Sequence, residues 1–444
     1  MNYDTIALRL ALAALALSLT GASSLAQEKT ALKLTLRQAV EMALNENPQV
    51  QIAVLNFAES KENRTLARSG LLPQASFRLD EQVQRENIDA LFGKPFPGIP
   101  QHIGPFQSFQ AGPAFSFPLL DLTAFRRWQS ASQEVRASEH DSQNVREQTV
   151  LLVVSQYLGS LQASANVTAA HSRVQLSQAL YEQASDLQKN GVGTGLDTLR
   201  AQVQFQNDQQ RLIEAQTQLK TSLFGLARLL NVDPNQEIEL TDQMSFFETP
   251  AFQGDTTLNQ AYAERPEMLA LEAREREEEI TRKQAGEERL PTLGVNGNWV
   301  YLGLSAQTAI PTYAYAATMD VPLVTSGRIH ADTVKADLEL KKINRLRQDL
   351  RNQIALEVKT AVVQLEAARH EVDVANEGVK LAQEEVNQAR DRFAAGVANN
   401  IEVVSAQDAL ERANDNQISA LYSYNQSRAD LARATGHIED VYAK

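Results

Sequence analysis

The stretch VKTAVVQLEAARHEVDVANEGVKLAQEEVNQARDRF, residues 358–393, decides the fold of this 444-residue chain. Large side chains recur in it every seven residues, and a small one follows each of the first five after three positions. The large residues are Val358, Leu365, Val372, Val379, Val386 and Phe393, and the small ones are Ala361, Ala368, Ala375, Ala382 and Ala389. Such a repeat keeps one seam of a helix facing a partner helix when the two supercoil. The stretch therefore predicts a long, packed helix that ends before Gly396.

The same pattern occurs a second time, 205 residues earlier in the chain. The seam positions become Val153, Ser160, Val167, Val174, Tyr181 and Gln188, and the same offset carries Gly396 to Gly191 and Ile401 to Leu196. One offset held over such a span is the signature of an internal duplication. We therefore expect two structural repeats, residues 27–255 and 256–444, each with a long helix of roughly 100 Å and a shorter return helix.

Composition and the N-terminal residues bound the class of protein. Residues 1–26 have the pattern of a secretory signal peptide, with an apolar run from Leu10 to Leu19 that is well short of the ~20 residues of a spanning helix. The chain contains no cysteine, which excludes disulfides, thiolate metal sites and a lipid anchor on cysteine. The mean hydropathy of −0.33 excludes a helical membrane protein, and the net charge of −13 argues against nucleic-acid binding.

Each repeat changes from helical to alternating periodicity after a proline, Pro73 in the first and Pro291 in the second. Alternation of this kind predicts strands at about 74–119 and 291–322, one hairpin in each repeat. The aromatic side chains there fit either the core of a soluble sandwich or the lipid-facing surface of an outer-membrane barrel. Because four strands cannot close a barrel and open edges are not viable in lipid, the membrane interpretation requires several chains in one barrel.

These motifs, in this order and duplicated, resemble the TolC-like outer-membrane factors, also called outer-membrane efflux proteins. The resemblance covers nearly the whole chain after residue 26 and rests on residues 36–40 (LRQAV), Asn47-Pro48, Leu72-Pro73, Leu290-Pro291, residues 191–202 (GVGTGLDTLRAQ), 226–232 (LARLLNV) and 393–396 (FAAG). It implies a mostly α fold with a smaller β part. In a homotrimer, duplicated long-helix hairpins would form a periplasmic α-barrel continuous with a 12-stranded outer-membrane β-barrel, four strands per protomer.

The resemblance also implies a function. The chain would be a passive exit channel of a tripartite efflux or type I secretion system, in the outer membrane of a Gram-negative bacterium and extending into the periplasm. Its partners would be a periplasmic adaptor (membrane fusion protein), an inner-membrane pump and outer-membrane lipid. The alternative is a periplasmic coiled-coil adaptor or scaffold without a channel, which would explain the helices but not four alternating strands. We expect no enzyme activity, cofactor or metal site, since the six histidines have no ligand spacing and no nucleophile–base pair occurs.

The turns between long and return helices are where the resemblance places adaptor contact. The residues concerned are Gly191, Val192, Gly193, Thr194, Gly195 and Leu196 in the first repeat and Gly396, Val397, Ala398, Asn399, Asn400 and Ile401 in the second. A phosphate-binding loop is not favoured for the glycine-rich run, because the run follows a helix and not a strand.

Asp197 and Glu402 occupy equivalent places just after these turns, and two interpretations of them are open. An acid at a helix start is stabilised by the helix dipole and needs no function. Alternatively, three copies of each acid line the pore constriction and favour cations. Ser405 stands where the family has a second acid. Ala398 stands where some members carry an arginine that latches the closed tip, so we expect that latch to be absent.

Overall fold

The computed structural model describes residues 31–94, 98, 100–246, 254–395, 397 and 400–443. The predicted signal peptide lies outside this part of the chain. By packing, the chain divides into two compact units. Unit 1 contains residues up to Ala39 together with Gly159–Gln243, and unit 2 contains Val40–Leu158 and Met244–Lys444. This division cuts across the two sequence repeats, whose boundary near residue 255 therefore stays a prediction.

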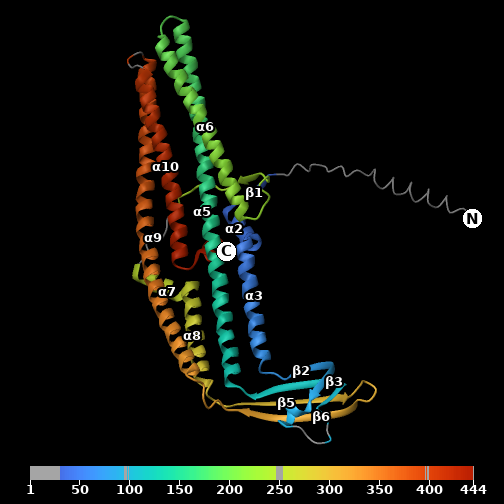
Figure 1. Ribbon diagram of the computed structural model, residues 1–444. Coiled ribbons are helices and arrows are strands. Elements are labelled where there is room, and N and C mark those ends of the chain that lie inside the picture. Colours follow the sequence, from blue (N-terminus) through green and yellow to red (C-terminus); the bar gives the residue numbers. More distant parts are fainter. Residues whose placement is uncertain are drawn as a thin grey trace, which may run out of the picture. The chain divides into compact units, whose positions relative to one another are not determined.

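The predicted helices are confirmed in both repeats (Figure 1). The first repeat contains α2 (Leu36–Glu46), α3 (Pro48–Ser69), the short α4 (Ile88–Phe92), α5 (Leu122–Lys189) and α6 (Gly195–Leu229). The second contains α7 (Gly254–Glu264), α8 (Pro266–Glu287), α9 (Arg328–Ala394), α10 (Asn400–Ala434) and α11 (Ile438–Tyr442). Prolines occupy the first position of α3 and of α8, where a missing N–H removes no intrahelical bond.

The seam of large and small residues is buried over part of its length, whereas Val379 is half-buried and Gln188, a seam position of the first repeat, is exposed. In α9, Val358, Leu365 and Val372 form a core with Tyr424 and Leu431 of α10. Farther along the same hairpin, Val386 and Ala389 form a second core cluster with two residues of α10. In the first repeat, Ser160 stands at a seam position and is fully buried, and its hydroxyl lies 2.7 Å from that of Ser222 on α6. The polar seam residue is therefore tolerated because it is hydrogen-bonded.

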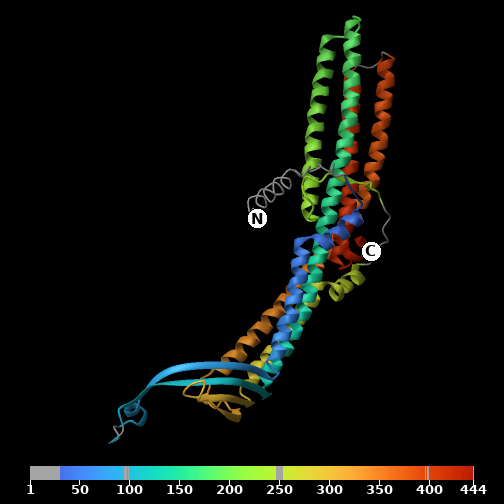
Figure 2. The same ribbon diagram turned by 90° about the vertical axis from the view of Figure 1, so that its right-hand side faces the viewer.

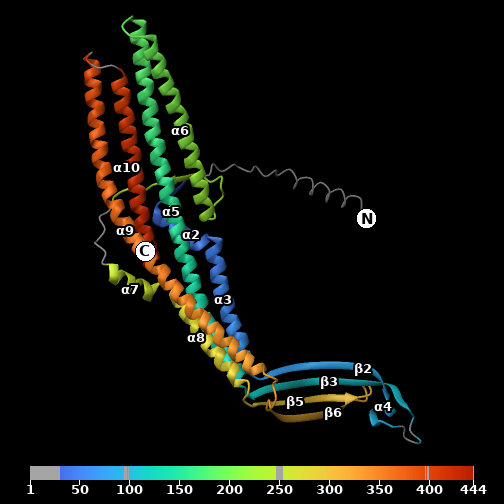
Figure 3. The same cartoon turned by 60° about the vertical axis from the view of Figure 1, so that its left-hand side comes forward.

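The four long strands form one antiparallel sheet in the order β2-β3-β5-β6, which Figure 3 shows directly. Their bounds are β2 (Gln74–Asn87), β3 (His102–Leu120), β5 (Thr292–Gly303) and β6 (Ile310–Asp320). β2 and β3 stay paired as far as Asn87 and His102, so the connection between them is confined to residues 88–101. The hairpin of β2 and β3 accordingly extends past that of β5 and β6 (Figure 2).

A second, smaller sheet was not predicted. In unit 1, β1 (Leu32–Leu34) pairs in parallel with β4 (Ile238–Leu240), which lies in the segment predicted only as a linker between the repeats. Leu34 and Ile238 are buried, and the Leu36 N–H donates to the Asp242 carboxylate at 2.6 Å. The pair therefore ties the start of the first repeat to the end of its return helix.

The register places most aromatic residues of the four long strands on one face of the sheet. Phe115, Gly297 and Tyr315 are direct neighbours on β3, β5 and β6, and the two rings approach to 6.0 Å between centroids above the glycine. The next pair along, Trp299 and Tyr313, has exposed side chains on both strands. Because Gly297 has no side chain, it leaves the space that the rings of Phe115 and Tyr315 occupy. Among the described residues, no helix carries an apolar stretch long enough to cross a bilayer.

We predict that Gly297→Val destabilises the sheet by about 1–3 kcal/mol, because a Cβ at this position would lie 2.6 Å from a Tyr315 ring carbon and 2.8 Å from Phe115. Gly294→Ala is the matched control, since its Cβ would meet nothing nearer than 3.8 Å. The measurement is the temperature at which the detergent-solubilised protein loses its strand signal. Equal melting of the two variants would show that the ring pair does not require the glycine.

Candidate functional site

The turn between α5 and α6 is built around two glycines. Gly191 has φ 74°, in the left-handed region that glycine adopts without strain. The N–H groups of Val192 and Gly193 both donate to the Leu187 carbonyl at the end of α5, at 3.0 and 2.9 Å. A Cβ on Gly193 would lie 3.0 Å from the backbone of that helix end. Both glycines are therefore required by the turn itself, whether or not a partner approaches.

Asp197 lies in the first turn of α6 and is held by its own helix start. The Thr194 side chain caps the helix by accepting from the Asp197 N–H at 3.2 Å, and its hydroxyl donates to the Asp197 carboxylate at 2.6 Å. The Arg200 guanidinium lies 3.7 Å from the same carboxylate. The helix-start interpretation thus accounts for all of these contacts, and the charge of Asp197 has a cation beside it.

The second turn brings Glu402 next to a cation that the sequence analysis missed. Of the predicted contact residues, Gly396, Ala398 and Asn399 lie outside the described residues, and α10 begins at Asn400. Arg392 of α9 lies with its Nε 2.9 Å from the Glu402 carboxylate. These two residues stand at equal distances on either side of Val397, and this symmetry about the turn is the signal that could have predicted their pairing. Ser405 is exposed.

Aliphatic side chains project from both turns. Val192 and Leu196 are 76% and 56% exposed, and Val397 and Ile401 are 68% and 56% exposed. Both turns therefore present apolar side chains beside a carboxylate that is paired with an arginine.

Unit 2 also contains a buried cluster of charges, here called the charged joint and made of Glu147, Arg265, Glu267, Glu357 and Arg433. Arg433, in the last turn of α10, lies 3.2 Å from the Glu147 carboxylate of α5 and also contacts Glu267 of α8. Arg265 binds Glu267 at 2.9 Å and contacts Glu357 of α9. The joint therefore ties four helices together.

The comparisons with known proteins agree with this architecture. The family described as "Outer membrane efflux protein" matches residues 39–232 and 257–437. The chain belongs to the outer membrane efflux protein family. Among curated relatives, the alkaline protease secretion protein AprF of Pseudomonas aeruginosa is 23% identical over 433 residues, with 95% of this chain and 89% of AprF covered. The pyoverdine export outer membrane protein OpmQ of Pseudomonas putida is 24% identical over 420 residues, with 90% and 85% covered.

Solved structures share the fold. The CmeC outer membrane channel of Campylobacter jejuni matches with a TM-score of 0.80 at 18% identity, covering 91% of this chain and 86% of CmeC. The outer membrane protein VceC of Vibrio cholerae matches with a TM-score of 0.76 at 16% identity, covering 90% and 96%. Membership of the outer membrane efflux protein family decides between the two functions that the sequence left open. The chain is an exit channel of the outer membrane that extends into the periplasm, and not a scaffold without a channel.

The two buried carboxyl groups of the charged joint titrate in opposite directions. Burial raises the pKa of Glu147 to about 7, although the Arg433 guanidinium acts to lower it. Burial also opposes ionisation of Glu267, but the hydrogen bond from Arg265 and the nearby charge of Arg433 outweigh it and lower its pKa to about 2. The same cluster of arginines therefore keeps one carboxyl ionised while the other gains a proton near neutral pH.

We predict that Glu147 makes this efflux protein less stable as the pH rises. Its pKa in the folded state lies above the usual carboxyl value of 4.5, so its stabilising contribution is present below pH 4.5 and is lost as the pH rises through about 7. Glu147→Gln should therefore unfold at a higher urea concentration than the native protein at pH 8, by at most ~3 kcal/mol, and equally at pH 4.5. Glu439→Gln, a half-buried acid of α11 paired with Arg146 at 2.5 Å, is the control. A difference between the native protein and Glu147→Gln that does not change with pH would contradict the prediction.

Proposed function

We propose that the chain works as a homotrimer and forms the passive outer-membrane duct of a tripartite efflux or type I secretion system. In this proposal a periplasmic adaptor docks at the hairpin turns and an inner-membrane pump supplies the energy. The relatives AprF and OpmQ are named for protease secretion and for pyoverdine export, which supports an export role without fixing the substrate. The observation that carries the proposal is a difference in exposure between equivalent helices of the two repeats. Apolar side chains that are buried in α8 have exposed equivalents in α3.

The sheet is open at both edges. In the order β2-β3-β5-β6 every neighbouring pair is antiparallel, so β6 runs antiparallel to β2. An edge β6 can therefore pair with β2 of a second copy in the same orientation, and repetition of this step closes a barrel without edges. Three copies give the twelve strands that the family resemblance implies.

The lead helices of the two repeats, α3 and α8, differ in what covers them. In α8, Ala270 and Ala273 are buried, at 1% and 4% exposure. When Pro48 of α3 is aligned with Pro266 of α8, their equivalents in α3 are Ile52 and Leu55, which are larger and are 48% and 66% exposed. A chain that exposes its larger apolar residues at positions buried in its other repeat lacks a neighbour there.

The contacts of α8 support a second copy of the chain as that neighbour. On one side, Glu275 of α8 binds Arg347 of α9 at 2.5 Å. On the other side, α8 meets α5, where Ser130 lies 3.5 Å from Glu277 and Arg126 binds Glu287 at 2.8 Å. In the duplication α3 corresponds to α8, α5 to α9 and α9 to α5. If the repeats pack equivalently, α3 therefore lies between its own α5 and an α9, and a second copy supplies that α9. The same equivalence pairs Glu59 of α3 with Lys335 of the partner subunit.

We predict that Glu59→Cys combined with Lys335→Cys gives a covalent trimer on mild oxidation, because the two positions meet across the subunit boundary. The chain contains no other cysteine, so the product is unambiguous. The matched control is Ser130→Cys with Glu277→Cys, the equivalent pair inside one chain, which should give a covalent monomer. Denaturing electrophoresis separates the two products. A covalent monomer from the Glu59→Cys and Lys335→Cys pair would exclude this assembly. So would the absence of a covalent product from that pair under conditions in which the control pair is oxidised.

We also propose that Asp197, Glu402 and Ser405 line the pore constriction, with the adjacent arginines moderating the charge. Asp197→Asn with Glu402→Gln should reduce cation selectivity and cation block in planar bilayers. Arg200→Gln with Arg392→Gln should increase both, because it leaves the same carboxylates without their cations. Trimers should form in all cases. Unchanged selectivity in both variants would return the two acids to the role of ordinary helix-start residues.

A further inference from the structure

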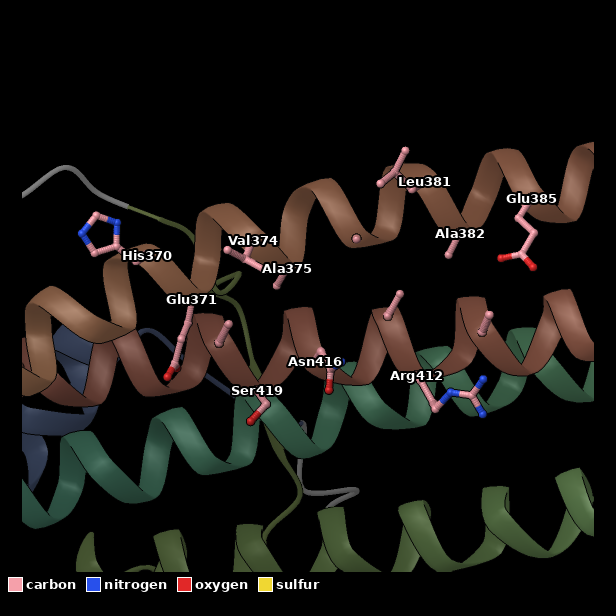
Figure 4. A pocket seen from close by; sticks show the side chains of 14 residues that line it. His370, Glu371, Val374, Ala375, Leu381, Ala382, Glu385, Arg412, Asn416 and Ser419 are labelled. Atoms are coloured by element: carbon pink, nitrogen blue, oxygen red, sulfur yellow. The ribbon is translucent and has the colours of Figure 1, made fainter.

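A groove of about 850 Å³ opens between α9 and α10, at a place where the seam of the hairpin is not filled (Figure 4). It lies between the core cluster that contains Val372 and the cluster that contains Val386. Figure 4 shows the side chains of Ala375 and Ala382 directed from α9 towards α10. Gly378 and Ala413 complete the small-residue lining, and the charged side chains of the lining are Glu371, Glu385 and Arg412.

The first repeat carries larger side chains at the equivalent positions. Arg173 stands at the position of Gly378, and Asp208 stands at the position of Ala413. Asp208 is 4% exposed, accepts a hydrogen bond from Gln204 at 3.2 Å and lies 3.9 Å from Arg211. The small residues that line the groove are therefore a feature of the second hairpin and not a necessary consequence of the long-hairpin fold.

The charge of the two hairpins differs in the same region. Residues 366–416 contain eleven acidic and five basic side chains, a net charge of −6. The equivalent residues 161–211 contain four of each, so their net charge is zero. A second copy of this chain offers this groove either an equally acidic hairpin or a neutral one, and neither complements it.

We propose that this groove is the docking site of a basic helix of the periplasmic adaptor, in which an aliphatic side chain enters the groove and flanking lysines or arginines face Glu371 and Glu385. The inference rests on the proposed function, because it assumes an adaptor. An amphipathic helix laid in an apolar groove is a common mode of recognition, and the net charge of −6 attracts a basic partner at long range. The first hairpin, which is neutral here and carries Arg173 and Asp208 in place of Gly378 and Ala413, does not bind in this way.

The test uses a cysteine reporter at the groove, read by its rate of maleimide labelling. Ser419→Cys lies in the exposed lining of the groove, and Glu214→Cys is the exposed equivalent on the first hairpin. We expect Ser419→Cys to be labelled rapidly in the purified protein and at least tenfold more slowly in intact cells of the source bacterium, with Glu214→Cys labelled rapidly in both. Slow labelling of Ser419→Cys in the purified protein would mean that a second copy covers the groove. Equal rates for Ser419→Cys in protein and cells, or slow labelling of both reporters in cells, would also overturn the proposal.

Two further variants test the fit and the charge separately, each carrying the Ser419→Cys reporter. Gly378→Arg with Ala413→Asp copies the filled first hairpin without changing the net charge, and it should restore rapid labelling in cells. Glu371→Gln with Glu385→Gln leaves the groove open and should reduce the protection several-fold. Continued protection in the filled variant would overturn the proposal. Bilayer conductance and the covalent trimer of the Glu59→Cys and Lys335→Cys pair are measured on the same groove variants without the Ser419→Cys reporter, so a failure of docking is distinguishable from a failure of the channel.

Discussion

The packing of one large residue against one small residue every seven positions is the constraint on which the second hairpin depends. Val358, Leu365 and Val372 keep α9 and α10 in register over a length that no compact core could support, because each contact fixes the rotation of the helix for the next one. A seam of this kind tolerates local departures. Ser160 is accommodated by a hydroxyl partner, and the small residues around Gly378 leave a groove without separating the helices, which a hydrogen bond of 2.8 Å from Gln417 to Asn376 still connects.

The internal duplication explains why a single chain is structurally incomplete. Within one chain, α8 packs between the two long helices α5 and α9, which we call the complete junction. The equivalent helix α3 has α5 of its own chain beside it but no α9, so the second junction is not formed within the chain. The side chains follow this logic, since the complete junction uses ion pairs such as Arg282 with Asp337 at 2.5 Å, whereas the unmade one exposes Ile52 and Leu55. The open edges of the sheet have the same origin. In the proposed trimer, one neighbouring subunit supplies both the α9 that packs against α3 and the β6 that pairs with β2.

The periodicity of apolar residues and the positions of prolines predict the helices and strands well, because each of these signals is local in the sequence. The prolines at 48 and 266, the seven-residue seam and the alternation around Tyr313 and Tyr315 gave the helices and strands to within a few residues at most ends. Short elements and contacts between residues far apart in the sequence were not predicted. The three-residue strands β1 and β4 are too short to show a period, and their pairing joins residues 206 positions apart. The pairing of Arg392 with Glu402 depends on how the turn folds, so the sequence supplied both residues but not their contact.

Differences between the two repeats show where their roles have separated. Asn47 caps α3 with its side chain at 2.9 Å from the Gln49 N–H, as expected of a helix start. Its equivalent, Arg265, makes no cap and instead enters the charged joint with 4% side-chain exposure. The second repeat has thus exchanged a local contact for one that links helices α8 and α9. Since a buried charge is retained only when its partners hold it in place, the joint requires the middle of α5 and of α9, the start of α8 and the end of α10 to stay in register, which fixes the base of the second hairpin. The groove lies farther along that hairpin, so a helix seated in it would act against an anchored base and not against a free pair of helices.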